Sequence, residues 1–422
     1  MTGWCSRARG VVLPPALLAP VLLALTILVA ITGVPAAQAD PGTPEPPEPC
    51  SNHETPPGPI SPSEEPAPGE DPPDPLPVPE EPIGGERLGE CGEVLPPEVP
   101  GPPEEITAAA WMISDLDSGE VLAARDPHGR HRPASLIKVL LAATVVDELD
   151  PDETVIASED DTDQVCTCVG LVTDEEYTVE DLLTGTLIHS GNDAAHALGS
   201  ALGGKREALE AMNGLATRLM ALDTRAATTS GLDGPGMTSS AYDLSLIFRH
   251  ALEQPRFVEA IGTRNLDFTL EDDESISLYN DNRLLGSYEG FIGGKTGYTN
   301  AARHTYMGAA ERGDRRVAVV LLHAEQRPVP VHEQAAAALD YGFALAGEGV
   351  APVGELVPPL QEGEGSLALD DDMLERDGEG FVHAILDGER SIPGMTLGVA
   401  VAGVALVGIV LIWRSRRDRL FR

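Results

Sequence analysis

The sequence predicts an α+β domain over residues 104–349, with one antiparallel sheet flanked by helices. Strand-like segments stand near both ends of this range, and helical patterns fill the stretch between them. The remaining segments are too polar, too apolar or too short for a second substantial domain. A sheet with strands from both ends must therefore join the first and last parts of the domain.

The elements of this domain can be placed in chain order. Pro133 precedes a helix expected over 135–149, and Thr178 is a suitable N-cap for a helix that ends near 189. The other expected helices cover 193–202, 205–221, 240–253 and 333–346. The expected strands cover 111–113, 121–123, 291–298, 305–310 and 316–323, and Asp117-Ser118-Gly119 is typical of a hairpin turn between the first two.

The segment before this domain is dominated by proline and acids. Residues 41–103 hold 22 of the 37 prolines, 14 acidic residues and one base, Arg87. Such a stretch buries too little apolar surface to offset its ordering entropy. Residues 40–103 are therefore expected to be a disordered, extended linker, and the domain is expected to fold and work without residues 40–100.

The charge of the chain excludes one class of function. The 422 residues include 28 Lys+Arg and 68 Asp+Glu, which gives a formal net charge of −40. Binding to nucleic acid requires a basic surface that neutralises phosphates, and every part outside the two ends is acidic. No nucleic-acid partner is expected.

The N-terminus is typical of a secretory signal peptide over residues 1–39. Arg7 and Arg9 precede an uncharged apolar stretch, and Ala37-Gln38-Ala39 forms a small-residue cleavage site. The apolar stretch is also long enough to act as an uncleaved anchor, so the sequence leaves cleavage open.

The C-terminus is expected to anchor the protein in the membrane. Residues 391–413 carry no charge over 23 positions, enough to span a bilayer, and the basic tail 414–422 marks the cytoplasmic side. The acidic residues 350–390 would form a stalk. The sequence thus predicts a single-pass protein of the cell membrane, with its catalytic domain on the extracellular, cell-wall side.

The cysteines agree with an exported protein. Cys50, Cys91, Cys166 and Cys168 lie in the part expected outside the cell. Four cysteines allow three pairings, and the sequence does not choose among them. A zinc site at Cys166 and Cys168 is disfavoured because no His or Cys lies at ligand spacing. No metal and no cofactor are expected.

Lysine is rare in this chain, which makes its positions informative. The three lysines are Lys138, Lys205 and Lys295. Arginine cannot lose its proton in a protein, whereas a buried lysine can act as a base. Ser135 and Lys138 stand three residues apart at the start of a predicted helix, so the hydroxyl and the amine share one face. A serine nucleophile needs such a base, although the spacing alone also fits a solvated serine and an amphipathic lysine.

Two further motifs carry side chains that suit the same chemistry. Ser190 and Asn192 lie at a junction between predicted helices, where they can pass a proton and bind a carbonyl, or cap a helix. Lys295-Thr296-Gly297 follows two glycines on a predicted strand, where a substrate backbone can approach closely. An exposed lysine on an edge strand is the alternative interpretation.

Together and in this order, S-x-x-K, S-x-N and K-T-G resemble the motifs of the penicillin-recognising serine enzymes. The flanking sequence is similar to the low-molecular-mass D-alanyl-D-alanine carboxypeptidases, peptidase family S11, over about residues 104–346. The matching segments are residues 132–138, 189–195, 212–213, 230–232 and 293–299. The resemblance implies the β-lactamase and D,D-peptidase type of fold, which adds a helical subdomain to the sheet and its flanking helices.

The resemblance also implies roles for individual residues. Ser135 would be the acylated nucleophile, Lys138 its base and Ser190 a partner in proton transfer. The implied substrate-binding residues are Asn192, Lys295, Thr296, Gly297 and Tyr298. Among these, Lys295 and Thr296 would bind the terminal carboxylate, and the backbone N–H of Tyr298 would form the oxyanion hole with that of Ser135.

The expected activity follows from these roles. The enzyme would remove the terminal D-alanine from peptidoglycan stem peptides that end in D-Ala-D-Ala, and β-lactam antibiotics would acylate it. A β-lactamase is a rival interpretation, but Glu210 only loosely matches the extra glutamate of the class A enzymes. A catalytically silent wall-binding protein is a second rival, and it has no need of an intact nucleophile and base.

Two departures from the family are visible in the sequence. Many members carry a β-rich domain after the catalytic one, and residues 350–390 are too short for it. Members also place an arginine after the last strand to hold the substrate carboxylate. Here Val331 or His332 stands at that position, with Arg327 a few residues away.

Overall fold

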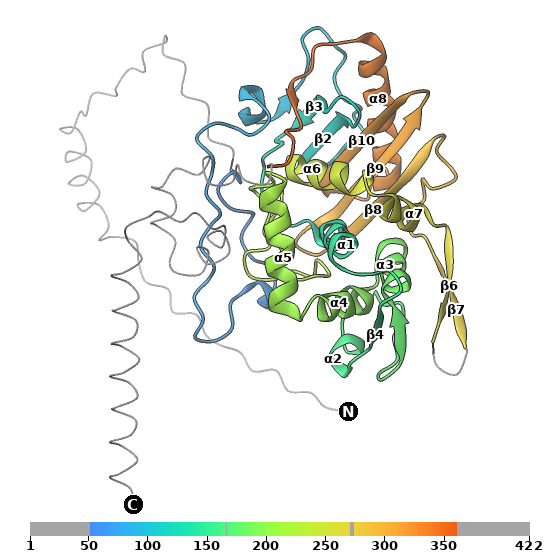
Figure 1. The fold of residues 1–422 in the computed structure, drawn as a ribbon. Coiled ribbons are helices and arrows are strands. Elements are labelled where there is room, and N and C mark those ends of the chain that lie inside the picture. The colour runs from blue at the N-terminus through green and yellow to red at the C-terminus, as the bar shows by residue number, and fades with distance from the viewer. Residues whose placement is uncertain (1–50, 166, 271–273, 361–422) are drawn as a thin grey trace, which may run out of the picture. The chain divides into compact units, whose positions relative to one another are not determined.

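The computed structural model describes residues 51–165, 167–270 and 274–360, and its centre is an antiparallel sheet (Figure 1). The strands follow the order β1–β3–β2–β10–β9–β8, and β11 also pairs with β3. Their bounds are β1 (Glu93–Val94), β2 (Ala110–Asp115), β3 (Glu120–Arg125), β8 (Phe291–Thr299), β9 (Arg303–Arg312), β10 (Arg315–Ala324) and β11 (Gly354–Glu355). Because β2 and β10 are neighbours, the sheet joins the first and last parts of the domain, which confirms the predicted α+β class.

Helices lie around this sheet and form a separate group at one end of it. They are α1 (Ile137–Glu148), α2 (Glu159–Thr162), α3 (Val179–Ile188), α4 (Asn192–Ala201), α5 (Lys205–Arg218), α6 (Ala241–Leu252), α7 (Pro255–Gly262) and α8 (Val331–Glu348), with the short 3₁₀ helices η1 (Pro62–Glu64), η2 (Glu86–Gly89) and η3 (Ala134–Leu136). The six predicted helices correspond to α1, α3, α4, α5, α6 and α8. The sequence analysis missed α7 and the two small hairpins β4–β5 (Thr154–Ile156, Glu176–Thr178) and β6–β7 (Asn265–Thr269, Ser275–Tyr279).

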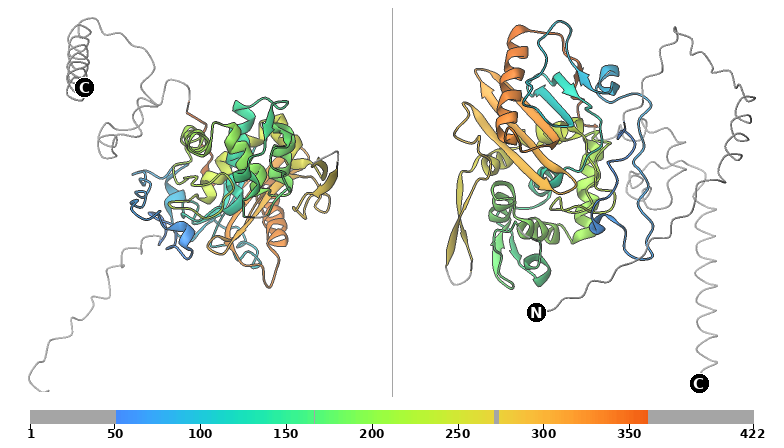
Figure 2. Two further views of the ribbon diagram at one scale, coloured as in Figure 1. Left: turned by 90° about the horizontal axis from the view of Figure 1, so that it is seen from below. Right: turned by 180° about the vertical axis from the view of Figure 1, so that it is seen from behind.

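Each face of the sheet has its own core. Along β2 the side chains alternate, so Trp111 and Ile113 pack in the cluster that contains α8, and Met112 packs with α1 and α6. Figures 1 and 2 show α8 on the face opposite to α1 and α6. The sheet is therefore buried on both faces, and β8 forms its edge next to the helical group.

The expected linker is the main difference between the sequence analysis and the structure. Residues 51–94, which we call the strap, run along one side of the domain and end in β1, which pairs with β3 (Figure 1, blue). Leu88 and Val94 of the strap are fully buried. Proline-rich extended backbone has no internal hydrogen bonds, so its carbonyls are open to donors of the domain. Amino-acid composition indicates only how much apolar surface a segment can bury. It does not predict a segment that is held to the domain by hydrogen bonds to its backbone carbonyls.

The domain also extends further toward the C-terminus than predicted. Val353 and Leu356 are buried, and β11 pairs with β3, so at least the start of the expected stalk is part of the domain. Cys91 and Cys168 are each disulfide-bonded. Within residues 51–360 as described, no helix is long and apolar enough to cross a membrane. The predicted signal peptide 1–39 and the predicted span 391–413 lie outside the described residues.

Candidate active site

Ser135 lies in a tight turn that the surrounding structure holds in place. It occupies η3, directly before α1, and the preceding Ala134 has a φ of +50° in the left-handed region. The Thr305 hydroxyl on β9 donates a hydrogen bond of 2.9 Å to the carbonyl of Pro133. Left-handed backbone at a residue with a side chain is unfavourable and is typical of functional sites, so the packing around this turn must enforce its geometry.

Lys138 lies in the first turn of α1 and is fully buried. Its Nζ is 3.1 Å from Ser135 Oγ and 2.7 Å from Asn192 Oδ1, and it donates a third hydrogen bond to the carbonyl of Ser230. Burial, together with the positive charge of Lys295, holds the pKa of Lys138 well below its usual 10.5. The structure thus places the predicted base beside the predicted nucleophile.

Asn192 is the first residue of α4 and connects two parts of the site. Its Oδ1 accepts from Lys138, and its Nδ2 donates to the carbonyl of Val165. Ser190, two residues earlier, is buried and has a φ of +62°. In the described part of the chain, the Ser190 hydroxyl makes no hydrogen bond to Ser135 or Lys138. Asn192 is therefore the member of this motif that directly contacts the lysine.

Lys295 and Thr296 lie on the edge strand β8, next to an acid that the sequence analysis missed. The Thr296 hydroxyl donates to Asp281 Oδ2 at 2.8 Å, and Lys295 Nζ lies 4.0 Å from the same oxygen. Lys295 is fully buried, and burial lowers its pKa. Asp281 stands in an Asn-Asp-Asn sequence with no motif around it, so the sequence carries no signal for this contact.

Gly297 allows β8 to lie directly against the serine turn. A Cβ built on Gly297 would come within 2.4 Å of the Thr305 hydroxyl and 2.9 Å of the backbone nitrogen of Ser135. Any side chain at this position would push the strand away. Tyr298 follows in the strand with a half-exposed ring that packs against His304. The backbone of β8 and that of Ser135 therefore lie side by side.

A second glycine supports the turn from the loop after α5. Gly231 has a φ of +82°, and a Cβ there would lie 2.0 Å from the carbonyl oxygen of Ala134. The preceding Ser230 provides the carbonyl that accepts from Lys138. Ser230 and Gly231 belong to a segment that matches the family in sequence, but only the folded structure shows that they support the lysine and the turn.

Val331 and His332 stand where the family is expected to place a carboxylate-binding arginine. Val331 is buried at the start of α8, and Arg327 is exposed in the connection from β10 to α8. His332 lies 4.0 Å from Glu333. The arginine nearest to Tyr298 along β9 is Arg303, and it is paired with Glu325 at 2.9 Å.

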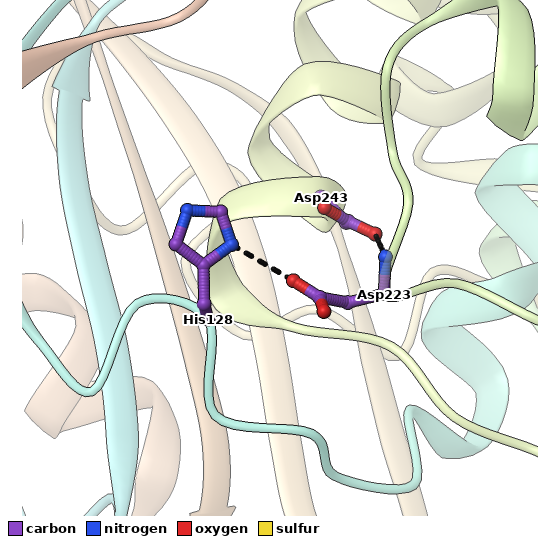
Figure 3. Close-up of side chains that lie close together, drawn as sticks. All are labelled: His128, Asp223 and Asp243. Atoms are coloured by element: carbon purple, nitrogen blue, oxygen red, sulfur yellow. Dashed lines mark hydrogen bonds and ion pairs between the residues drawn. The ribbon is translucent and has the colours of Figure 1, made fainter. Parts of the chain in front are cut away.

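His128, Asp223 and Asp243 are the described residues whose side chains lie close enough together to offer three ligands to a metal (Figure 3). Each is already engaged. The two ring nitrogens of His128 face Asp223 Oδ2 at 2.8 Å and the carbonyl of Ile83 at 3.0 Å. The other Asp223 oxygen accepts from the buried Arg130 at 2.9 Å. The third side chain, Asp243, accepts from the backbone of Asp223 and from the Thr224 hydroxyl, so the hydrogen bonds of this cluster are made within the protein.

The geometry of Ser135 and its neighbours suits acyl transfer. A serine hydroxyl beside a buried amine of lowered pKa has its general base in contact. The backbone of this turn lies against the edge strand β8, which also carries a buried lysine and a hydroxyl. This arrangement can attack a carbonyl and bind an anionic group next to it.

Comparisons with known proteins agree with this chemistry. The sequence profile of the D-alanyl-D-alanine carboxypeptidase family S11 matches residues 97–326. The D-alanyl-D-alanine carboxypeptidase DacB2 of Mycobacterium tuberculosis is 46% identical over 242 residues, which cover 56% of this chain and 83% of that protein. DacD of Escherichia coli, another D-alanyl-D-alanine carboxypeptidase, is 32% identical over 243 residues, which cover 54% of this chain and 61% of DacD.

Solved structures show the same relationship. A D-alanyl-D-alanine carboxypeptidase from Mycobacterium tuberculosis matches 63% of this chain and 99% of its own, with 42% identity and a TM-score of 0.58. A mutant of a DD-transpeptidase from Streptomyces matches 57% of this chain and 98% of its own, with 26% identity and a TM-score of 0.54. The chain therefore belongs to the D-alanyl-D-alanine carboxypeptidases of serine peptidase family S11.

Proposed function

We propose that this chain is a membrane-anchored enzyme that removes the terminal D-alanine from peptidoglycan stem peptides through an acyl-enzyme on Ser135. The observation that supports this most directly is the buried Lys138 Nζ, 3.1 Å from Ser135 Oγ and with a pKa well below that of an ordinary lysine. The names of its relatives supply the substrate class, a peptide that ends in D-Ala-D-Ala.

The acylation step begins with Ser135. Its Oγ attacks the carbonyl carbon of the penultimate D-alanine, and its proton passes to neutral Lys138. The carbonyl oxygen becomes an oxyanion, which the backbone N–H groups of Ser135 and Tyr298 stabilise. When the tetrahedral intermediate collapses, the C–N bond breaks, and the leaving amine of D-alanine takes the proton from Lys138. Ser190, which in the described structure of the free protein is hydrogen-bonded to neither Ser135 nor Lys138, would turn toward Lys138 in the substrate complex to pass this proton on.

Deacylation follows the same path in reverse. A water molecule gives a proton to Lys138 and attacks the ester carbon. The ester bond to Ser135 Oγ breaks, the serine takes a proton back from Lys138, and the shortened peptide leaves. A β-lactam that acylates Ser135 would block the enzyme at this stage.

The substrate is held by its terminal carboxylate. Lys295 supplies a positive charge at the edge strand. The Thr296 hydroxyl, which donates to Asp281 in the free protein, would turn its proton to the substrate carboxylate when the substrate binds. Gly297 keeps this part of β8 against the serine turn, so the bound substrate would meet the strand and Ser135 together. Asn192 was also expected to bind substrate. Its amide oxygen accepts from Lys138 and its amide nitrogen donates to the Val165 carbonyl, so we assign it the role of holding Lys138 in position.

The cellular place of the enzyme is proposed from sequence alone. Residues 1–39 would direct export, and 391–413 would anchor the chain in the cell membrane with residues 40–390 on the wall side. Fractionation of cells that express the full chain or a chain ending at 390 tests this. The full chain is expected in the membrane pellet, and recovery of both chains in the same soluble fraction would contradict the anchor.

The activity is tested on the full chain in detergent, with Ser135→Ala as the matched control. Penicillin should form a slowly hydrolysed adduct on the peptide that contains Ser135, and a pentapeptide ending in D-Ala-D-Ala should release D-alanine. Rapid loss of the adduct without D-alanine release would identify a β-lactamase. No adduct and no release would identify a wall-binding protein without catalysis.

A further inference from the structure

The strap holds the segment that leads to Ser135. Asn52 of the strap accepts from the backbone nitrogen of Arg130 at 2.8 Å, and its side chain donates to the Arg130 carbonyl at 3.1 Å. The Arg130 guanidinium is 1% exposed and donates to three strap carbonyls, those of Glu54, Leu76 and Pro77, at 2.5–2.8 Å. A chain segment five residues before the nucleophile is thus attached to the strap through backbone and side chain.

A second contact brings a charge of the strap closer to the nucleophile. Arg132, three residues before Ser135, forms an ion pair with Glu64, and their side chains are 6% and 4% exposed. The other oxygen of Glu64 accepts from the backbone nitrogens of Ile60 and Ser61 at 2.9 and 3.2 Å. The backbone of the strap therefore fixes the orientation of the Glu64 carboxylate in η1. Its second oxygen is directed at Arg132.

The same pair acts electrostatically on an acid that is hydrogen-bonded to the end of strand β8. Asp233, in the loop after α5, accepts from the Thr299 hydroxyl at 2.9 Å, and Thr299 directly follows Tyr298. Burial and the nearby charge of Glu64 raise the pKa of Asp233, while Arg132 opposes this shift. Asp233 thus feels the charges of Glu64 and Arg132 and is hydrogen-bonded to Thr299, the last residue of β8.

We propose that Glu64 is a positioning residue of the active site: by pairing with Arg132, it holds the Ser135 turn in register with β8. This inference rests on the proposed function. Arginine cannot lose its charge, so without Glu64 the buried Arg132 must turn toward Asp233 or toward water. Either movement pulls on the segment before Ser135 or releases Thr299 from Asp233. A shift of about 1 Å at reacting groups costs about 100-fold in rate.

The test compares Glu64→Gln, Arg132→Gln and the double variant in the full chain. Glu64→Gln keeps the acceptor for Ile60 and Ser61 and removes the charge. We expect the rate of acylation by penicillin and kcat for D-alanine release to fall about 10- to 100-fold per folded molecule, with KM changed less than about twofold. The double variant should lose less than the product of the two single losses, because no charge is left unpaired.

Glu90→Gln is the matched control. Glu90 is also a strap glutamate paired with an arginine, Arg87, but the two side chains are 50% and 42% exposed. Acylation and kcat should stay within about twofold of the wild-type values, because exposed pairs contribute little. Wild-type chain that is not acylated would refute the proposed function itself, before any variant is compared.

A role in stability alone predicts a different result. In that case Glu64→Gln would lower the melting temperature and leave kcat per folded molecule unchanged, which would overturn the proposal. If Glu64→Gln does not fold, Glu64→Asp serves instead, since it keeps the charge and shortens its reach. Glu64→Asp should speed backbone hydrogen exchange in residues 130–137 and lower kcat several-fold. If both the exchange rates and kcat of Glu64→Asp equal those of the wild type, the proposal is overturned as well.

Discussion

Lys138 shows how burial sets the chemistry of a single residue. It has three hydrogen-bond acceptors around its Nζ, and none of them is a carboxylate. The charged form therefore gains no direct ion pair to offset desolvation, and the nearby charge of Lys295 disfavours it further. The same residue type at Lys205 is exposed at the start of α5.

Replacing Lys138 by arginine separates a structural cation from a base. A guanidinium keeps the positive charge and cannot accept a proton, so Lys138→Arg should lose acylation by penicillin and D-alanine release by about 10²–10⁴-fold per folded molecule. Lys205→Arg should behave like the wild type in both assays. Near-wild-type acylation of Lys138→Arg would contradict the role of Lys138 as base, even if Ser135 were still the labelled residue.

At the scale of elements, the site depends on three backbone segments that lie in direct contact. The serine turn η3 lies between the end of β8 and the loop that contains Gly231, and at each contact a glycine replaces a side chain. A Cβ at Gly231 would meet the Ala134 carbonyl, and one at Gly297 would meet the Thr305 hydroxyl and Ser135 nitrogen. The geometry of η3 is therefore determined by its neighbours as much as by its own sequence.

Gly231→Ala should displace the serine turn. The added Cβ would lie 2.0 Å from the Ala134 carbonyl oxygen, so the loop or the turn must move, and acylation should fall by at least about 100-fold. Gly313→Ala is the control, because Gly313 has a similar φ of +65° with no atom within 4 Å of the added Cβ. It should cost about 1 kcal/mol of stability and leave acylation unchanged. Equal acylation by both variants would refute this account.

The start of α6 contains a carboxyl that should titrate near neutral pH. Burial, and the charge of Asp223 beside it, raise the pKa of Asp243 to about 8 from 3.8. Its protonated form therefore stabilises the fold fully below about pH 4, and this contribution is lost as the pH rises through 8. Asp243 Oδ2 accepts from the backbone of Asp223 and the hydroxyl of Thr224, and an amide oxygen can do the same.

Asp243→Asn should thus flatten the fall of stability between pH 4 and 8. The measurement is the free energy of unfolding in urea at several pH values, for wild type, Asp243→Asn and Asp314→Asn, a change in the exposed turn between β9 and β10. Asp314→Asn should follow the wild-type curve. Parallel curves for wild type and Asp243→Asn would contradict a raised pKa.

At the scale of the whole molecule, the strap makes the catalytic domain larger than its family profile. The profile begins at residue 97, whereas the strap supplies β1, the buried Leu88 and the partners of two buried arginines. These contacts oppose the expectation that the domain folds and works without residues 40–100. Removing one partner of a buried ion pair leaves an uncompensated charge, which is a large penalty.

Deletion of residues 51–94 should lower the free energy of unfolding by at least about 3 kcal/mol. The control replaces the exposed residues 67–71 of the strap by glycine and serine at equal length and should stay close to the wild type. Urea unfolding of the three chains measures both effects. A deletion that unfolds at the wild-type urea concentration would restore the view of the strap as a passive linker.

Local patterns were sufficient where the interacting groups are close in the sequence. Ser135 and Lys138 stand three residues apart at the start of α1, and apolar runs with capping and turn residues indicate most of the helices and sheet strands. The contacts that complete the site join distant segments. Lys138 meets Asn192 across 54 residues and Ser230 across 92, and Arg132 meets Glu64 across 68. No spacing rule connects such pairs.

The sequence by itself determined the fold class and the family, and it predicted Ser135 and Lys138 as nucleophile and base, because these depend on residue type and short spacing. Only the tertiary structure decided that Asp281 orients Thr296, that the strap belongs to the domain and that Glu64 meets Arg132. Proline-rich composition predicts disorder from missing apolar burial. Here the buried Arg130 binds three backbone carbonyls of the strap, and the buried Arg132 binds the Glu64 carboxylate. Which arginine meets which acceptor depends on the folded shape, so composition does not predict these contacts.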